Sequence, residues 1–372
     1  MKLTFQKTAL LNGINIVLKA VPSKTTMPIL ECILIDASTD EIKLTANDME
    51  LGIETKVEGD ILEKGKIALD AKLFSEIIRK LPDGDTPVSI TSDNHFNTVI
   101  ECENAVFNIQ GRDGEEFSYL PYIERDQHIS LTQFTLKEAI RQTIFSISPN
   151  DSNKMMTGEL FQVTDNELKV VSLDGHRMSI RKVELKDHYE NIKVIVPGKT
   201  LGEISKILNG DNEKDVRIYF SKNHILFEFD DTVVVSRLIE GEYFRIDQML
   251  SSDYETKVTV NKKEFLDCID RASILIREND KKPIIISITD HSMELKMNSS
   301  FGSMNAEVMI HKNGKDIMIG FNPKFLMDAL RIIDDEEVDL YMMNPKSPCF
   351  IKDADETYIY LILPVNFNAA SV

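Results

Sequence analysis

One helical pattern occurs three times in this chain, at intervals of about 125 residues. The three copies span residues 72–81, 199–208 and 324–333. Each copy begins with a lysine, has an acid four residues later and has a base three residues after that. These spacings place the charged side chains on one face of a helix and an apolar stripe on the other. A period of this length predicts three tandem copies of one folding unit.

A second helix is predicted earlier in each repeat, directly after a short strand. The corresponding stretches are 2–11, 134–140 and 257–266, and each places apolar residues at helical spacing. Alternating or β-branched runs, which are typical of strands, fill the rest of each repeat. Each repeat therefore reads as helix, strands, helix, strands, and the fold class that we predict is α+β.

Turn and charge signals mark two linkers, at residues 118–128 and 245–254. They divide the chain into three predicted domains, 1–124, 125–250 and 251–368. The last residues, 369–372, are mostly small, and we interpret them as a terminal tail that is either disordered or a remnant of cloning.

The composition excludes several classes of protein. With 42% hydrophobic and 28% charged residues the chain has a globular composition. No apolar run approaches the roughly 20 residues that a membrane span needs. Residues 1–6 also lack the apolar core of a signal peptide. We therefore expect a cytoplasmic protein that has no membrane partner.

Metal and cofactor sites have no support in the spacing of cysteine and histidine. The four cysteines are far apart and form no CxxC pair, and the seven histidines show no HExxH or similar ligand spacing. We predict no metal, no disulfide framework and no cofactor.

The charge balance constrains any contact with nucleic acid. A formal net charge of −18 argues against a protein that holds nucleic acid by a broadly basic surface. The absence of tryptophan also weakens a function that depends on stacking single-stranded bases. Local clustering of lysine could still support weaker contacts.

The stretch 167–180 contains the best candidate for a functional site. A β-branched strand ends at the turn signal Asp174-Gly175, so His176 and Arg177 are presented where the chain reverses. Asp174 and His176 could form a catalytic pair, or this turn could be the wall of a binding groove. No nucleophile elbow, phosphate loop or paired carboxylates accompany the pair. Only the aspartate recurs at the corresponding turn of the first repeat, 48–50, so we predict a structural turn and no enzyme.

Several local motifs, in this order and at this spacing, resemble the β sliding clamp family of bacterial DNA polymerase. The resemblance covers nearly the whole chain. The motifs that carry it are Met1-Lys2-Leu3-Thr4, Met27-Pro28-Ile29-Leu30, Thr45-Ala46-Asn47-Asp48-Met49-Glu50, Asp174-Gly175-His176-Arg177-Met178, Ser236-Arg237-Leu238-Ile239-Glu240-Gly241 and Ile362-Leu363-Pro364.

The resemblance implies the DNA clamp fold, in which three two-helix, two-sheet domains form half of a ring. Two copies, joined head to tail, would encircle double-stranded DNA without reading its sequence. The ring would tether the DNA polymerase, and so confer processivity, and would also bind the clamp loader and repair proteins. This role predicts a cytoplasmic, nucleoid-associated protein.

The resemblance also implies a cleft between the second and third domains that takes short apolar linear motifs from partners. By matching position, the cleft residues would be Met156, Leu173, Gly175, His176, Arg177, Met178, Phe244, Gln248, Met249, Leu361, Leu363, Pro364 and Val365. Phe244, Gln248 and Leu173 differ from the residues common in the family, as do the final Asn366-Phe367. Soft, apolar side chains suit a site that accepts several related peptides, although core packing is the alternative for each of them. We expect Arg177 at the edge of this cleft, where it could meet a peptide carboxylate or carbonyl.

Two further surfaces follow from the resemblance and the repeat. The residues predicted to face DNA are Lys24, Lys72, Arg79, Lys80, Lys154, Lys199, Lys206 and Lys324. A solvated helix face is the alternative for each. For the dimer interface, a strand near 105–109 should pair with a strand near 299–304, so that it includes Phe107 and Ser303, with apolar contacts from Phe74, Ile77 and Ile78. The alternative to the ring is a β-rich repeat protein that binds proteins without encircling DNA.

Overall fold

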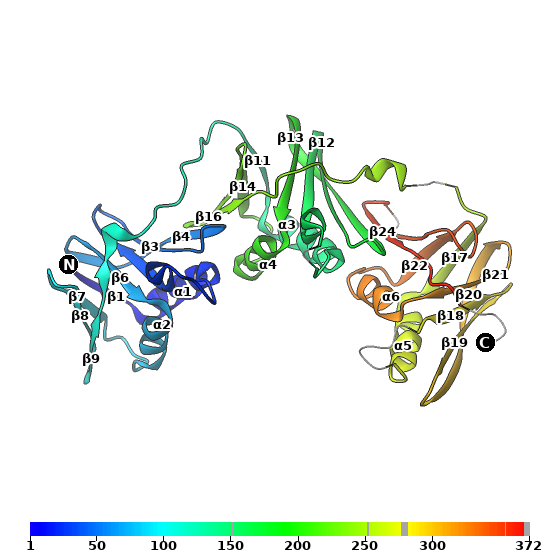
Figure 1. The fold of residues 1–372 in the computed structure, drawn as a ribbon, viewed down its shortest axis with the longest axis horizontal. Coiled ribbons are helices and arrows are strands. Elements are labelled where there is room, and N and C mark those ends of the chain that lie inside the picture. The colour runs from blue at the N-terminus through cyan, green and yellow to red at the C-terminus, as the bar shows by residue number, and fades with distance from the viewer. Residues whose placement is uncertain (151, 251–252, 277–281, 354, 368–372) are drawn as a thin grey trace. The chain divides into compact units, whose positions relative to one another are not determined.

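The computed structural model describes residues 1–150, 152–250, 253–276, 282–353 and 355–367 (Figure 1). The predicted tail, 369–372, lies outside these ranges. The chain divides into two compact units, the first made of Met1–Leu136 with Glu203–Leu238 and the second of Lys137–Gly202 with Ile239–Val372. The central repeat thus contributes one part to each unit.

The described part of the chain contains six α-helices, two in each repeat, at the positions that the periodicity predicts. They are α1 (Lys7–Val17), α2 (Ala71–Lys80), α3 (Gln133–Thr143), α4 (Gly198–Ile207), α5 (Lys262–Ser273) and α6 (Pro323–Leu330). Side-chain caps set several of the N-termini. Asp70 accepts a hydrogen bond from the Leu73 amide, and Asn261 and Asn322 cap α5 and α6 in the same way. None of these helices is long and apolar enough to cross a membrane.

The first unit contains two antiparallel sheets. One has the strand order β5-β1-β7-β8-β9, and the other has the order β10-β6-β2-β3-β4-β16-β15-β14-β11. The strands of the first repeat are β1 (Lys2–Phe5), β2 (Cys32–Asp36), β3 (Ile42–Asn47), β4 (Leu51–Val57), β5 (Asp60–Glu63), β6 (Lys66–Asp70), β7 (Val88–Ser92), β8 (Asn97–Cys102), β9 (Ala105–Gln110) and β10 (Arg112–Asp113). The central repeat adds β11 (His128–Thr132), β14 (Asp215–Phe220), β15 (His224–Phe229) and β16 (Thr232–Arg237).

The second unit is built on one antiparallel sheet of strand order β12-β13-β24-β23-β22-β17-β20-β19-β18-β21. The central repeat supplies the long hairpin of β12 (Gly158–Leu173) and β13 (Arg177–Pro197). The third repeat supplies β17 (Thr256–Asn261), β18 (Ile284–Ile288), β19 (Ser292–Ser299), β20 (Gly302–Gly314), β21 (Ile317–Phe321), β22 (Glu337–Met342), β23 (Cys349–Lys352) and β24 (Tyr358–Ile362).

The sheets continue from one repeat into the next at two places. Strand β4 of the first repeat pairs with β16 of the central repeat, and β13 of the central repeat pairs with β24 of the third. Each of these inter-repeat ladders consists of five residue pairs, Leu51 to Thr55 in one and Arg177 to Arg181 in the other. Each seam between repeats is thus a backbone hydrogen-bonded ladder and not only a contact between side chains.

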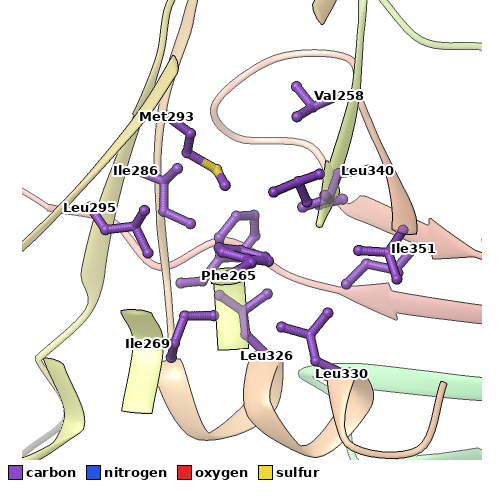
Figure 2. Packing of buried hydrophobic residues seen from close by; sticks show 14 of the residues in the cluster. Val258, Phe265, Ile269, Ile286, Met293, Leu295, Leu326, Leu330, Leu340 and Ile351 are labelled. Atoms are coloured by element: carbon purple, nitrogen blue, oxygen red, sulfur yellow. The ribbon is translucent and has the colours of Figure 1, made fainter. Parts of the chain in front are cut away.

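The core of the third repeat shows how the helices meet the sheet. Phe265 and Ile269 on α5, and Leu326 on α6, point into a cluster with Ile286 and Met293 from the sheet (Figure 2). Helix α5 packs against α6, as α1 packs against α2 in the first unit. Their apolar stripes are buried, so the charged face that the sequence predicts is left toward solvent.

Candidate functional site

The turn between β12 and β13 is shaped by Asp174. Its Oδ1 accepts hydrogen bonds from the backbone amides of His176 at 2.9 Å and Arg177 at 3.1 Å. The Asp174 amide donates to the Arg177 carbonyl at 3.2 Å, and Gly175 has a φ of +87°. A positive φ is where glycine is strongly favoured, which explains the Asp-Gly sequence.

Asp174 and His176 do not form the catalytic pair that was one alternative for this stretch. The second oxygen of Asp174, Oδ2, accepts from Arg177 Nε at 3.0 Å. The His176 ring instead stacks on Phe325 of α6, with centroids 6.3 Å apart and planes at 26°. Asp174 therefore orients Arg177 and the turn, and its carboxylate contacts the backbone amide of His176 instead of the imidazole ring.

Arg177 is buried, and the expectation that it lies at a groove edge is wrong. Only 8% of its surface is exposed. Besides Asp174, its guanidinium donates to Asp328 Oδ2 at 2.7 Å and to the Phe145 carbonyl at 2.6 Å. It also lies 4.3 Å from the centroid of the Phe325 ring. A charge can be buried when acceptors and aromatic faces replace its water, and these partners do so.

The remaining predicted cleft residues separate into a buried layer and an exposed layer. Leu173, Met178 and Leu361 are 4%, 2% and 7% exposed and belong to one apolar cluster. Met156 and Phe244 pack against this cluster and are partly buried, and Pro364 and Val365 are also partly buried. The exposed members of the set are Gly175, His176, Gln248, Met249 and Leu363.

The segment that follows β24 is fixed beside this turn by backbone hydrogen bonds. The Leu363 amide donates to the His176 carbonyl at 2.8 Å, and the Val365 amide donates to the Gly320 carbonyl at 2.8 Å. Leu363 and Met249 remain 38% and 43% exposed. These two side chains are the apolar groups that the predicted set presents at the surface.

Sequence reasoning missed three residues of the site, Phe145, Phe325 and Asp328. Asp328 was assigned to the charged outer face of the repeated helix, whereas it is partly buried and pairs with Arg177. One signal could have identified Phe325. The residue after the opening lysine is Leu73 in the first repeat and Thr200 in the second, so the aromatic ring is specific to the third.

A buried acid lies near this turn on β12. Glu159 is 0% exposed, and its Oε2 lies 2.8 Å from Thr143 Oγ1. Thr143 Oγ1 also lies 2.7 Å from the Ala139 carbonyl. Glu159 Oε2 accepts from Thr143, and the other carboxyl oxygen, Oε1, is buried with no hydrogen-bond partner among the described residues, so the charged form would be poorly compensated. In agreement, burial raises the pKa of Glu159 to about 8.

The eight basic residues predicted to face DNA are all exposed. Lys72, Arg79 and Lys80 lie on α2, Lys199 and Lys206 on α4, and Lys324 on α6. Lys154 begins the short 3₁₀ helix Lys154–Thr157. Arg79 donates to Ser75 Oγ at 3.3 Å, and Lys206 pairs with Glu203 at 2.8 Å.

The apolar part of the predicted dimer interface needs correction. Phe74 and Ile78 are 0% exposed and Ile77 is 5% exposed, because they fill the core of the first repeat. They have almost no surface to offer a second copy. Phe107, by contrast, is partly buried on β9, the outer strand of the five-stranded sheet, and Ser303 is exposed on β20.

Three family models match successive parts of the chain. The N-terminal, central and C-terminal domains of the DNA polymerase III beta subunit match residues 1–121, 130–244 and 247–366. The chain belongs to the β sliding clamp family of bacterial DNA polymerase III. The α+β fold of three tandem clamp domains, predicted from the repeat and the resemblance, is thereby confirmed.

Individual sliding clamps are similar over the full length of the chain. A beta sliding clamp of Staphylococcus aureus is 36% identical over 376 aligned positions, covering 98% of this chain and 99% of that protein. The crystal structure of the Bacillus subtilis DNA polymerase sliding clamp is 35% identical with a TM-score of 0.95, covering 99% and 100% of the two chains. A Eubacterium rectale structure assigned as a DNA polymerase III beta subunit is 67% identical with a TM-score of 0.96 and the same coverage.

Arg177→Met is expected to lower the free energy of unfolding of this sliding clamp by about 3 kcal/mol, because it leaves the partly buried Asp174 and Asp328 without their cation. Urea unfolding followed by circular dichroism measures the change. Arg181→Met is the matched control, since Arg181 on the same strand is 28% exposed in its side chain and pairs with Asp353 at a longer 3.4 Å. Equal losses for the two variants would contradict the role assigned to Arg177.

Glu159→Gln is expected to remove a pH dependence of stability. The pKa of Glu159 is about 8 in the folded chain, against the ordinary 4.5, so the folded state holds the proton more tightly. Its stabilising contribution is complete below about pH 4.5 and is lost as pH rises toward 8, at up to about 1.4 kcal/mol for each pH unit. Glutamine cannot ionise and keeps a carbonyl oxygen that can accept from Thr143. Urea midpoints at pH 5.5, 6.5 and 7.5 should favour the variant increasingly, and parallel curves would refute the protonated acid.

Proposed function

We propose that this β sliding clamp acts as a homodimeric ring that encircles double-stranded DNA and tethers the replicative polymerase, without catalysing a reaction itself. Its domains would be 1–124, 125–250 and 251–368. The observation that supports this most strongly is that three repeats, matched in order by the family models, are joined through continuous sheet ladders. A ring made of two copies needs several tandem domains in each copy, and the three matched repeats supply them. The proposed location is the cytoplasm, in association with the nucleoid.

The proposed DNA contacts are weak and independent of sequence. The lysines at the start of α2, α4 and α6 are exposed and recur at the same helical position. Phosphate contacts of exposed lysines carry no base information and weaken steeply with salt. Enclosure by the ring would supply retention, so an overall charge of −18 is compatible with the function.

We propose that the surface around the turn at Asp174 binds short apolar motifs from the polymerase, the clamp loader and repair proteins. Leu363 and Met249 present exposed apolar side chains. His176 lies beside Leu363, because its carbonyl accepts a hydrogen bond from the Leu363 amide. The buried residues Leu173, Met178 and Leu361 support this surface from below. Arg177 acts by holding the turn and α6 together and not by meeting the peptide.

Ring closure would join strand β9 of one copy to β20 of another. Residues Gly302 to Met309 of β20 pair with β19, while only residues Ile310 to Gly314 pair with β17, so the pairings of the described residues leave one side of the first segment open. Val106 on β9 is 55% exposed, and Leu73 on α2 is 46% exposed. These two residues replace Phe74 and Ile78 as the apolar contacts that we propose.

Retention on circular DNA tests the ring and its lining. With a clamp loader and ATP, the wild-type chain should remain on nicked circular DNA and be released when the circle is cut. Lys72→Glu combined with Lys199→Glu and Lys324→Glu should lower loading by about tenfold at moderate salt, because three phosphate contacts become repulsive.

The control for this experiment reverses three exposed lysines outside the helices, Lys2, Lys222 and Lys346, one in each repeat. It should load like the wild type. Equal release from circular and linear DNA would reject the ring and favour the alternative, a repeat protein that binds proteins without encircling DNA. Equal loading by both triple variants would reject the proposed lining alone.

Leu363→Asp combined with Met249→Asp should weaken binding of a fluorescent peptide that copies the clamp-binding motif of the cognate polymerase. A loss of at least about tenfold is expected, since each change places a charge where an apolar anchor would be buried. Both positions are exposed, so folding and dimerisation should persist in light scattering. Met318→Asp on β21, 39% exposed, is the control. Unchanged peptide affinity in the double variant would exclude this surface.

A further inference from the structure

The seam between the first and central repeats contains the same turn as the site at Asp174. The Asp48 amide donates to the Leu51 carbonyl at 3.0 Å, and Asp48 Oδ1 accepts from the Glu50 amide at 3.0 Å and the Leu51 amide at 2.7 Å. Met49 has a φ of +75°. Residues 48–51 thus reproduce, bond for bond, the turn at 174–177, including its left-handed second residue.

The strand from the following repeat also meets the two turns in the same way. The Arg237 amide donates to the Glu50 carbonyl at 2.8 Å, just as the Leu363 amide donates to the His176 carbonyl at 2.8 Å. One residue into each ladder, Gly52 pairs with Val235 where Met178 pairs with Leu361. The two seams are therefore equivalent position by position.

The two seams differ at this ladder position, which is Met178 in one and Gly52 in the other. The Met178 side chain is buried, with 2% exposed, whereas Gly52 has no side chain. The space above Gly52 is taken by Leu120 from the linker, and a Cβ added at Gly52 would lie 2.1 Å from Leu120 Cδ2. Leu120 thus occupies this seam as a side chain from elsewhere in the chain.

The linker is held over the seam by a small number of contacts. Asn47 Nδ2 donates to the Ser118 carbonyl at 3.5 Å, and Ile123 is buried with Val235 in a small apolar cluster that Leu120 packs against. Beside Leu120 is a cavity of about 260 Å³, bordered by Met49 and Tyr119 among others. Met49 is 56% exposed and Tyr119 is 59% exposed, so the cavity is bordered by side chains that solvent reaches, one of them a flexible methionine.

We infer that the first seam is a second peptide groove, built on the same turn as the site at Asp174 and closed by the chain's own Leu120. Its ligand would be a short peptide with a leucine-type aliphatic anchor that takes the place of Leu120 above Gly52. The position of Leu120 above Gly52 shows that this site accepts a leucine side chain. The inference rests on the function proposed for the site at Asp174, because the two seams are equivalent, but the peptide test below measures binding above Gly52 and can fail while that function stands.

Complementation by a synthetic peptide tests the groove. The probe is a peptide copying residues 117–123, with Tyr122→Trp as its reporter. Tyr122 is 91% exposed and the chain contains no tryptophan, so the change should not disturb binding and the signal comes from the peptide alone. The full-length Leu120→Gly chain should bind one peptide per protomer at least about tenfold more tightly than the wild type, whose groove is filled. Any binding at the site at Asp174 is common to both chains and cancels in the comparison.

The controls separate the groove from nonspecific binding. The same peptide with Leu120→Gly should not bind either chain. Gly52→Ala should push Leu120 out, so that chymotrypsin cuts the linker several-fold faster, yet its added methyl group should prevent peptide binding. Equal peptide binding by Leu120→Gly and wild-type chains, or by both variants, overturns the inference. If Leu120→Gly loses its cooperative unfolding transition, the Gly52→Ala chain decides, and unchanged linker cleavage there overturns the proposed closure.

Discussion

The two inter-repeat ladders are the interactions on which the rest of the structure depends. Without them, β4, β13, β16 and β24 would each be an exposed edge, with unpaired amides and carbonyls that invite association with other chains. Pairing β4 with β16 and β13 with β24 satisfies those groups and fixes the register between neighbouring repeats. The seams also set where side chains from two repeats can meet, and the turns at Asp48 and Asp174 each lie at the start of one of these ladders.

The aspartate turns at the start of β4 and β13 explain why one scaffold gives two different surfaces. Asp48 and Asp174 make the same backbone hydrogen bonds and need the same left-handed second residue. The identity of the next side chains is then unconstrained by the turn itself. Arg177 in one turn reaches Asp328 on α6, whereas Leu51 in the other is simply buried. Function thus varies at positions that the turn does not use.

Periodicity in the sequence was sufficient to predict the six helices and the threefold organisation, because amphipathic spacing is a local property. The burial of Arg177 was not predictable in the same way. Its partners, Phe145 and Asp328, are 32 and 151 positions away in the sequence, and Asp328 belongs to the next repeat. The assignment of Phe74 and Ile78 to the dimer interface was wrong for a related reason. An apolar stripe on a helix predicts burial, but it does not say whether the partner is the same chain or another copy.

The acidic balance of the chain has a structural counterpart in the way its helix bases are paired. Arg141 pairs with Glu138 through three hydrogen bonds, Lys206 pairs with Glu203 at 2.8 Å, and Arg331 lies 3.3 Å from Asp270. A phosphate that approached such a base would have to compete with an acid already in place, which reduces the net gain of each contact. Many weak and replaceable contacts allow a ring to move along a duplex, whereas a few strong ones would fix it in one position. In the proposed ring, an acid such as Glu203 beside Lys206 would therefore promote sliding as much as the lysine promotes retention.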